Sequence, residues 1–161
     1  KLIEELGDGK LDCAIVALPV SEPSLTEVAL FDEAMVLVRP ADDAHRPVPD
    51  MDTLGQMKLL LLEEGHCFRD QALSFCALRN TLPREGLDGS SLNTLVQMVD
   101  HDLGLTLLPQ MAIDAGILAG TQVVARPVKS DTAKREIVLV WRKNSPREAD
   151  FRLLAEELRA G

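Results

Sequence analysis

Helical and strand patterns alternate along the whole sequence, and this alternation constrains the fold more than any other feature. In residues 68–79, apolar side chains recur at helical spacing, which predicts an amphipathic helix. Residues 12–18 are apolar at nearly every position, which is typical of a strand covered on both faces. The alternation favours an α/β fold, with a mostly parallel sheet and helices on both faces. The expected helices cover residues 1–6, 51–56, 68–79, 92–101 and 146–159, with a short one opened by Pro109, and the expected strands cover 12–18, 25–38, 58–62, 105–108, 123–127 and 136–141.

The composition describes an acidic globular protein without a membrane span. The sequence has 161 residues, of which 46% are hydrophobic and 27% charged, and its formal net charge is −9. A chain of this length supports one core of moderate size or two lobes. No apolar run approaches the roughly 20 residues that a membrane span needs, so we expect no membrane partner. Lysine and arginine form no stripe, so these residues cannot supply the clustered phosphate contacts of direct DNA binding.

The first residue and the cysteine count give two more expectations. The sequence begins at Lys1, in what reads as the middle of a helix, so we expect it to be a fragment of a longer protein. Three cysteines, an odd number in a sequence without export features, indicate a reducing cytosol.

Cys67 and Cys76 are the most informative pair of residues. If both belong to the helix expected here, nine residues at about 1.5 Å rise put their Cα atoms roughly 13 Å apart. Nine steps of about 100° also place them on opposite faces of that helix. Because a disulfide needs Cα atoms within about 7 Å, these thiols can bond only if the segment between them comes apart. That geometry is typical of a redox switch.

The surroundings of the two cysteines differ in a way that suits such a switch. Cys67 lies where the carboxyl end of a strand meets a helix N-terminus, whose partial positive charge stabilises a thiolate. His66 and Arg69 could add cationic or hydrogen-bonding support. Cys76 lies on the apolar face beside Ala72, where we expect it to be buried and suited to resolve a sulfenic acid. The residues alone leave a second interpretation open, in which both cysteines are inert core residues.

Other polar candidates have simpler interpretations. Cys13 lies in an expected strand and reads as a core thiol. Ser90 or Ser91 should cap the helix at 92–101, although a helix start could also hold an anion. Residues 100–102 read Asp-His-Asp, but adjacent helical residues point in different directions, so we expect no metal site and no cofactor. Trp141 follows a strand and should serve packing.

Residues 65–71 read Gly-His-Cys-Phe-Arg-Asp-Gln, and a second cysteine follows nine positions after the first. In this motif the chain resembles the LysR-type transcription regulators, and among them the peroxide-sensing members. The resemblance covers essentially the whole chain, and the cysteine motif is its specific part. The Leu-Leu-Pro run at 107–109 is shared by the wider family, and Asp102 departs from the pattern because the family usually has glycine there.

The resemblance implies a periplasmic-binding-protein-like (type 2) regulatory domain with two lobes, built from mixed, mostly parallel sheets flanked by helices. Residues 1–31 and 132–161 would form lobe I, which would be incomplete, and residues 32–131 would form lobe II with the redox switch. The winged helix-turn-helix DNA-binding domain of the family has no counterpart in this sequence.

The resemblance also implies the roles of individual residues. Cys67 would be the thiol that attacks hydrogen peroxide and Cys76 its disulfide partner, while His66, Arg69 and Asp70 would shape the reactive pocket. The domain would then be a sensor that controls oxidative-stress genes in the bacterial cytoplasm, and not an enzyme. Its partners would be hydrogen peroxide, further copies of itself in a homodimer or tetramer, promoter DNA through the absent domain, RNA polymerase, and a reductant of the glutaredoxin/glutathione or thioredoxin type.

Two other functions compete with the peroxide sensor. A LysR-type regulatory domain that binds a small metabolite, with inert cysteines and an anion held near Ser90 or Ser91, is the main alternative. A thiol peroxidase or oxidoreductase is disfavoured, because the sequence contains neither Cys-x-x-Cys nor the Pro-x-x-x-Thr-x-x-Cys pattern of peroxiredoxins.

Overall fold

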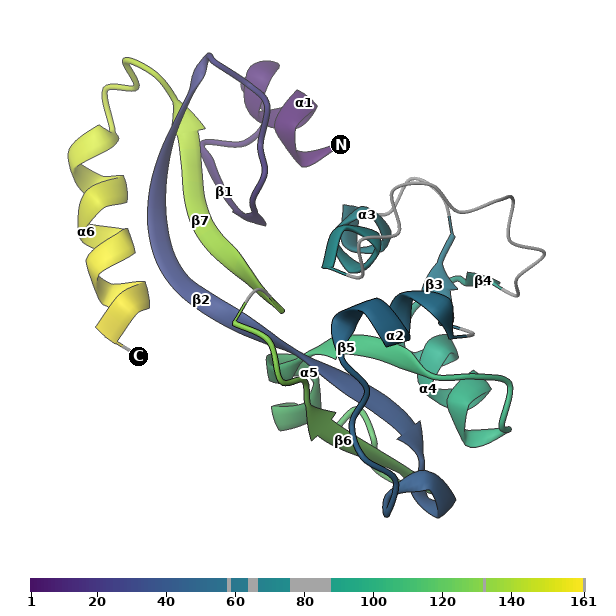
Figure 1. The fold of residues 1–161 in the computed structure, drawn as a ribbon. Helices are drawn as coiled ribbons and strands as arrows, with labels where there is room; N and C mark the ends of the chain where they lie inside the picture. Colours follow the sequence, from purple (N-terminus) through teal and green to yellow (C-terminus); the bar gives the residue numbers. More distant parts are fainter. Residues whose placement is uncertain (58, 64–66, 76–87, 132, 161) are drawn as a thin grey trace. The chain divides into compact units, whose positions relative to one another are not determined.

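A computed structural model describes residues 1–57, 59–63, 67–75, 88–131 and 133–160, and of Cys67, Ser74 and Phe75 it describes the backbone. Every helix and strand expected from the sequence is present in these ranges, with ends that differ by a few residues (Figure 1). The expected helical residues 76–79 lie outside them. The helices are α1 (Leu2–Gly7), α2 (Met51–Gln56), α3 (Cys67–Phe75), α4 (Leu92–Asp100), α5 (Gln110–Asp114) and α6 (Glu148–Ala160), with a 3-10 turn at Ala41–Asp43. The strands are β1 (Cys13–Ala17), β2 (Leu25–Pro40), β3 (Leu61–Leu62), β4 (Asp88–Gly89), β5 (Thr106–Pro109), β6 (Val123–Pro127) and β7 (Lys134–Arg142).

The chain divides into two compact units. Unit 1 contains Lys1–Glu33 and Arg135–Gly161, and unit 2 contains Ala34–Lys134. The chain therefore passes from one unit to the other within β2 and returns at the start of β7. No helix in the described ranges is long and apolar enough to cross a membrane.

Unit 1 is organised by β7, which has a helix on each side. β7 pairs with β1 in antiparallel register, and it lies next to β2 in the sheet. Because successive strand residues point to opposite faces, its side chains separate into two apolar sets. Ile137, Leu139 and Trp141 contact Phe151 and Ala155 of α6, whereas Val138 and Val140 cluster with Leu6 of α1. Figure 1 shows α1 and α6 on opposite sides of these strands.

Trp141 confirms its expected packing role. Its side chain is fully buried, and its ring centroid lies 5.5 Å from that of Phe151. In α6, Phe151 is buried and Leu158 half-buried, whereas Leu154 is 41% exposed. The buried face follows positions 151, 155 and 158, and a residue three positions after Phe151 falls at the edge of that stripe.

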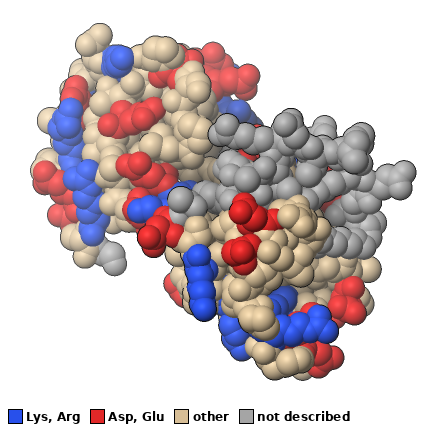
Figure 2. Space-filling model, viewed as in Figure 1, with Lys and Arg blue, Asp and Glu red and all other residues tan. Residues whose placement is uncertain are grey.

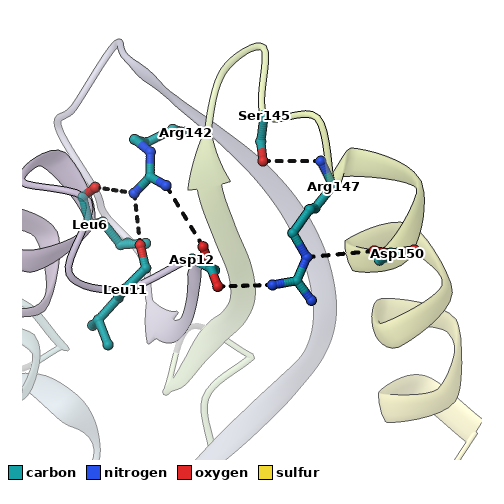
Figure 3. A network of polar contacts seen from close by, with 7 residues as sticks. All are labelled: Leu6, Leu11, Asp12, Arg142, Ser145, Arg147 and Asp150. Carbon is teal, nitrogen blue, oxygen red and sulfur yellow. Dashed lines mark hydrogen bonds and ion pairs between the residues drawn. The ribbon is translucent and has the colours of Figure 1, made fainter.

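Arginine side chains join the two sequence segments of unit 1. Arg142 donates to the carbonyl oxygens of Leu6 and Leu11, the second at 2.7 Å, and Asp12 accepts from Arg147 at 2.9 Å (Figure 3). Arg135 contacts the buried carboxylate of Glu33 through both Nε and Nη2, each at 2.6 Å. These contacts tie the ends of β7 to residues more than one hundred positions earlier in the sequence.

Unit 2 has the same two-sided construction. Met35, Leu37, Leu61 and Leu107 point toward one apolar cluster, which includes Leu54 of α2 and Ala72 of α3. Their neighbours Val38, Leu60, Leu62 and Leu108 point toward a second cluster with Leu95, Val96 and Val99 of α4. The expectation of strands with helices on both faces is therefore confirmed in this unit.

The expectation that the sheet is mostly parallel is wrong for the described strand pairs. β1–β7, β2–β5 and β2–β6 are antiparallel, while β3–β4 and an isolated bridge between Leu59 and Leu105 are parallel. β5 and β6, which are joined through α5, do run in the same direction. One stretch of β2 pairs with both, so β2 lies between them and runs in the opposite direction. The sequence pattern could not reveal this arrangement.

β1 is also less buried than its apolar sequence predicts. It is the terminal strand in the described order β1-β7-β2-β5, and Ile15 is 50% exposed. An apolar run indicates that a strand can be buried on both faces. Whether other elements cover those faces depends on the tertiary structure.

Gly89 offers a test of how tightly β4 packs on α4. A Cβ atom at this position would lie 2.7 Å from Cδ2 of Leu95, which is itself buried in the core. We expect Gly89→Ala to lower the free energy of unfolding by about 1–3 kcal/mol, because an overpacked core forces side chains off their rotamers. Gly7→Ala is the control: no atom lies within 4 Å of its added Cβ, and alanine favours the helix. Urea denaturation that finds equal stability for both variants would contradict this packing.

Candidate functional site

Cys67 lies at the point in unit 2 that the sequence predicts for a reactive thiol. It is the first residue of α3, and the strand β3 ends at Leu62, five positions earlier. Phe68, Ala72 and Leu73 of α3 contact the apolar cluster that contains Leu61. The helix is therefore held on the core by its apolar side, and its N-terminal turn follows the carboxyl end of β3.

Arg69 is engaged with the backbone and with an acidic residue that the sequence did not single out. Its Nη1 donates to the carbonyl oxygen of Leu62 at 2.6 Å and lies 3.0 Å from Oδ1 of Asp88. The Arg69 side chain is mostly buried, with 16% exposed. Asp88 belongs to the two-residue strand β4, which is too short to produce a sequence signal, and its pairing with Arg69 could not be predicted.

The remaining residues of the expected pocket are only partly within the described ranges. Asp70 is exposed in the first turn of α3, where a carboxylate is favourable to the helix dipole. His66 and Cys76 lie outside the described residues, as does the Cys67 side chain. The grouping of His66, Arg69 and Asp70 around Cys67 therefore stays a prediction.

Ser91 is the N-cap of α4, as expected. Its Oγ accepts a hydrogen bond from the backbone N–H of Thr94 at 3.2 Å and lies 3.1 Å from the Thr94 hydroxyl. The exposed Ser90 contacts the same hydroxyl at 3.4 Å. These contacts satisfy a backbone donor of the first turn, which is the ordinary function of a serine at this position.

Two side chains of the Asp-His-Asp run at the end of α4, those of Asp100 and His101, contact backbone groups. Asp100 accepts from the backbone N–H of Gln122 at 2.7 Å, and Nδ1 of His101 lies 2.8 Å from the Gln97 carbonyl oxygen. Asp102 has a φ of +59°, the left-handed conformation that favours glycine. Asp102 adopts this conformation at some energetic cost, at a position where the family that the sequence resembles usually has glycine. Among the residues that can be described, no three His, Cys, Asp or Glu side chains are placed to hold a metal ion.

Cys13 lies in β1, is half-buried, and contacts the apolar cluster around Trp141 without forming a disulfide. It agrees with the expected core thiol, although it is less buried than a fully covered strand would make it.

Hollows on unit 2 that are lined by described residues include two that do not involve α3. One, of about 440 Å³, is bordered by acidic side chains at Asp42, Asp43, Asp100 and Asp102. The other, of about 500 Å³, lies between the start of the unit 2 part of β2 and the end of β6, beside Gln110 and Asp131. On the face shown in Figure 2, basic side chains of the described residues lie beside acidic ones over both units.

The family model of the LysR substrate binding domain matches residues 1–161. The chain belongs to this family. A member of the LysR substrate-binding domain family has a type 2 periplasmic-binding-protein-like fold, so the expected α/β fold of this type is confirmed, apart from the strand directions described above.

Several relatives of this LysR substrate-binding domain are OxyR proteins. The DNA-binding transcriptional dual regulator OxyR of Escherichia coli K12 is 40% identical over 162 residues, which cover 99% of this chain and 53% of that protein. The reduced regulatory domain of OxyR2 from Vibrio vulnificus has a TM-score of 0.85 at 34% identity, covering 99% of this chain and 76% of the other. A hydrogen peroxide-bound cysteine-to-serine mutant of Corynebacterium glutamicum OxyR has a TM-score of 0.87 at 33% identity, covering 99% and 51%.

The LysR substrate-binding domain described here spans about half the length of the curated OxyR that it matches. Its relatives are transcription regulators and not enzymes, which agrees at the level of the family with the expected absence of catalytic turnover.

The cap at Ser91 can be tested by substitution. We expect Ser91→Ala to lower the free energy of unfolding by about 1 kcal/mol, because the Thr94 N–H loses its acceptor. Ser90→Ala is the matched control and should change stability by less than about 0.5 kcal/mol. Chemical denaturation with equal losses for the two serines would show that capping is not what distinguishes Ser91.

Proposed function

We propose that this LysR substrate-binding domain senses hydrogen peroxide for a transcription factor through a reversible disulfide between Cys67 and Cys76. The observation that carries the proposal is the Gly-His-Cys-x-Arg-Asp-Gln motif, with its cysteine at the first residue of α3, five positions after the end of β3. Two likenesses support it: the similar C. glutamicum OxyR mutant is a hydrogen peroxide-bound structure, and the E. coli OxyR matches 99% of this chain.

The reaction uses two thiols and one molecule of peroxide. The Cys67 thiolate attacks one oxygen of hydrogen peroxide, the O–O bond breaks, and protonation of the departing hydroxide gives water and a sulfenic acid. The Cys76 thiolate then attacks that sulfur, an S–S bond forms, and the sulfenic hydroxyl leaves as a second water. Two electrons pass from the thiols to the peroxide, and a cytosolic dithiol or glutathione-dependent reductant would reverse the change.

Thiolate formation alone explains a limited part of the reactivity. An ordinary thiol with a pKa of about 8.5 is roughly 3% ionised at pH 7, so full ionisation multiplies the reactive form by about thirty. This corresponds to about 2 kcal/mol of barrier. Further stabilisation must come from donors aimed at the departing oxygen, and His66 and Arg69 are the proposed contributors. Asp70 would orient these donors.

The helix explains why bridging would change the structure. From Cys67 to Phe75 the backbone of α3 is helical, so its two ends are separated by about 12 Å along the axis. One further peptide step of about 3.8 Å cannot bring the next Cα within the roughly 7 Å of a disulfide while that helix persists. Bond formation therefore requires α3 to open, and opening exposes apolar surface at Phe68 and Ala72.

The proposal extends to the whole regulator. Unit 1 would be part of regulatory lobe I and unit 2 would be lobe II, close to the division at residues 31/32 and 131/132 that the resemblance implies. Opening of α3 would reorient subunits of a homodimer or tetramer. A DNA-binding domain outside this chain would then change its contact with promoter DNA and with RNA polymerase in the bacterial cytoplasm, as the DNA-binding E. coli relative suggests.

Treatment with hydrogen peroxide distinguishes a peroxide sensor from a metabolite-binding regulatory domain and from an enzyme. The first dose is one equivalent of peroxide. Added to the reduced full-length protein, it should produce a Cys67–Cys76 disulfide within seconds, detected by mass spectrometry of the digested protein. Unchanged thiols at that dose would favour a regulatory domain that reads a metabolite. Turnover of many equivalents with a recycling reductant would favour a peroxidase.

Single substitutions assign the roles of the cysteines. Cys67→Ser should abolish the response, because no sulfenic acid can form there, whereas Cys76→Ser should leave a sulfenic acid that a dimedone-type probe traps. Cys13→Ser is the control, since this thiol lies in unit 1 and should not take part. Peroxide-dependent activation that persists in Cys67→Ser would overturn the assignment.

A further inference from the structure

The N-terminal turn of α3 is fastened to two other elements at one point. Arg69 donates to the carbonyl oxygen of Leu62, the last residue of β3, and its guanidinium meets the carboxylate of Asp88, the first residue of β4. The distances are 2.6 and 3.0 Å. The helix α3, which would rearrange when Cys67 and Cys76 form a disulfide, thus has an ion pair in its N-terminal turn.

The Asp88 side of this pair is fixed to the core of unit 2. β4 pairs with β3 in parallel register, Leu61 with Asp88 and Leu62 with Gly89, and the N–H of Glu63 donates to the Gly89 carbonyl oxygen. Gly89 lies against Leu95 of α4 so closely that a Cβ would not fit. Asp88 is therefore held by a backbone whose position is set by two neighbouring elements.

The Arg69 side belongs to a helix that packs on the core through apolar side chains. Phe68, Ala72 and Leu73 contact the cluster around Leu61, and such contacts do not fix an orientation as an ion pair does. With 16% of Arg69 and 36% of Asp88 exposed, the pair is partly shielded from water but still open to salt. The Arg69–Asp88 pair therefore adds a directional, salt-sensitive attachment between α3 and the strands of unit 2.

We propose that Asp88 is a positioning residue that sets the redox equilibrium of the switch, by holding Arg69 and with it the helical form of α3. This inference rests on the proposed disulfide function. The Arg69–Asp88 pair stabilises the reduced form, in which α3 is helical, and it must break when the helix opens for Cys67 to reach its partner. Removing the carboxylate charge therefore shifts the equilibrium toward the disulfide.

The same pair limits the charge that Arg69 can offer to Cys67. A guanidinium that already contacts a carboxylate and a carbonyl oxygen stabilises a second anion, such as a thiolate, less strongly. Asp88 thus acts on the switch in two ways: holding the helix shifts the equilibrium toward the dithiol, and partly neutralising the cation that would support the thiolate slows the attack on peroxide, which is an effect on the rate and not on the equilibrium. Both effects make the sensor less responsive than its motif alone would make it.

The test is a redox titration of the full-length regulator in glutathione buffers. Asp88→Asn removes the charge and keeps the size of the side chain, and it should raise the equilibrium constant for disulfide formation about fivefold, the upper range for a partly exposed ion pair. Asp88→Glu should restore a value near that of the wild type. Asp43→Asn is the matched control, because Asp43 forms a 3.1 Å ion pair with Arg46 elsewhere in unit 2.

Salt separates an electrostatic role from a merely structural one. Raising the salt concentration from about 0.05 M to about 0.5 M should move the wild type and Asp43→Asn toward the disulfide, and it should move Asp88→Asn much less. If the wild type oxidises normally but Asp88→Asn matches Asp43→Asn at both concentrations, the role of Asp88 is overturned and the peroxide-sensing function stands.

A second measurement keeps the two proposals distinct. If the wild type forms no Cys67–Cys76 disulfide, the proposed function fails, and hydrogen exchange of the reduced protein still decides the role of Asp88. The amides of α3 should then exchange about fivefold faster in Asp88→Asn than in the wild type, while those of α4 keep their rates. Equal exchange in α3 would overturn the inference.

Discussion

The buried ion pair between Glu33 and Arg135 marks the constraint on which unit 1 depends. Glu33 ends the first segment of that unit and Arg135 begins the second, so the pair lies where the chain leaves the unit and returns to it. Removing one partner of a buried pair leaves an uncompensated charge, at a cost of roughly 3–5 kcal/mol. Unit 1 therefore forms only when two segments about one hundred residues apart have met.

Strands with a set of apolar side chains on each face organise the packing of both units. β7 alternates its side chains between α6 and α1, and in unit 2 the strands alternate between α2 with α3 on one side and α4 on the other. Arg142 and Asp12 add polar contacts at the far end of β7 (Figure 3). This framework places α3 after the carboxyl end of β3, where an α/β fold offers a helix N-terminus to a ligand or a reactive group.

Much of this could be predicted from the sequence because it depends on local patterns. The helical spacing of apolar residues located α3 and α4, the serine before residue 92 located a cap, and the pattern around Cys67 placed a thiol at a helix start. In the Asp-His-Asp run, the side chains of Asp100 and His101 lie within hydrogen-bond distance of backbone groups. Strand direction and the exposure of Ile15 and Leu154 were not predictable, since each depends on neighbours that are distant in sequence.

The sequence by itself determined the family, the succession of helices and strands, and the position of Cys67 at the first turn of a helix, because these follow from residue types at short spacing. Only the tertiary structure decided that β2 separates β5 from β6, that Glu33 meets Arg135, and that Arg69 is held by Asp88. The physical reason is the same in each case. A strand neighbour or a charge partner is chosen by how the whole chain is packed, and nothing in the residues next to it in sequence records that choice.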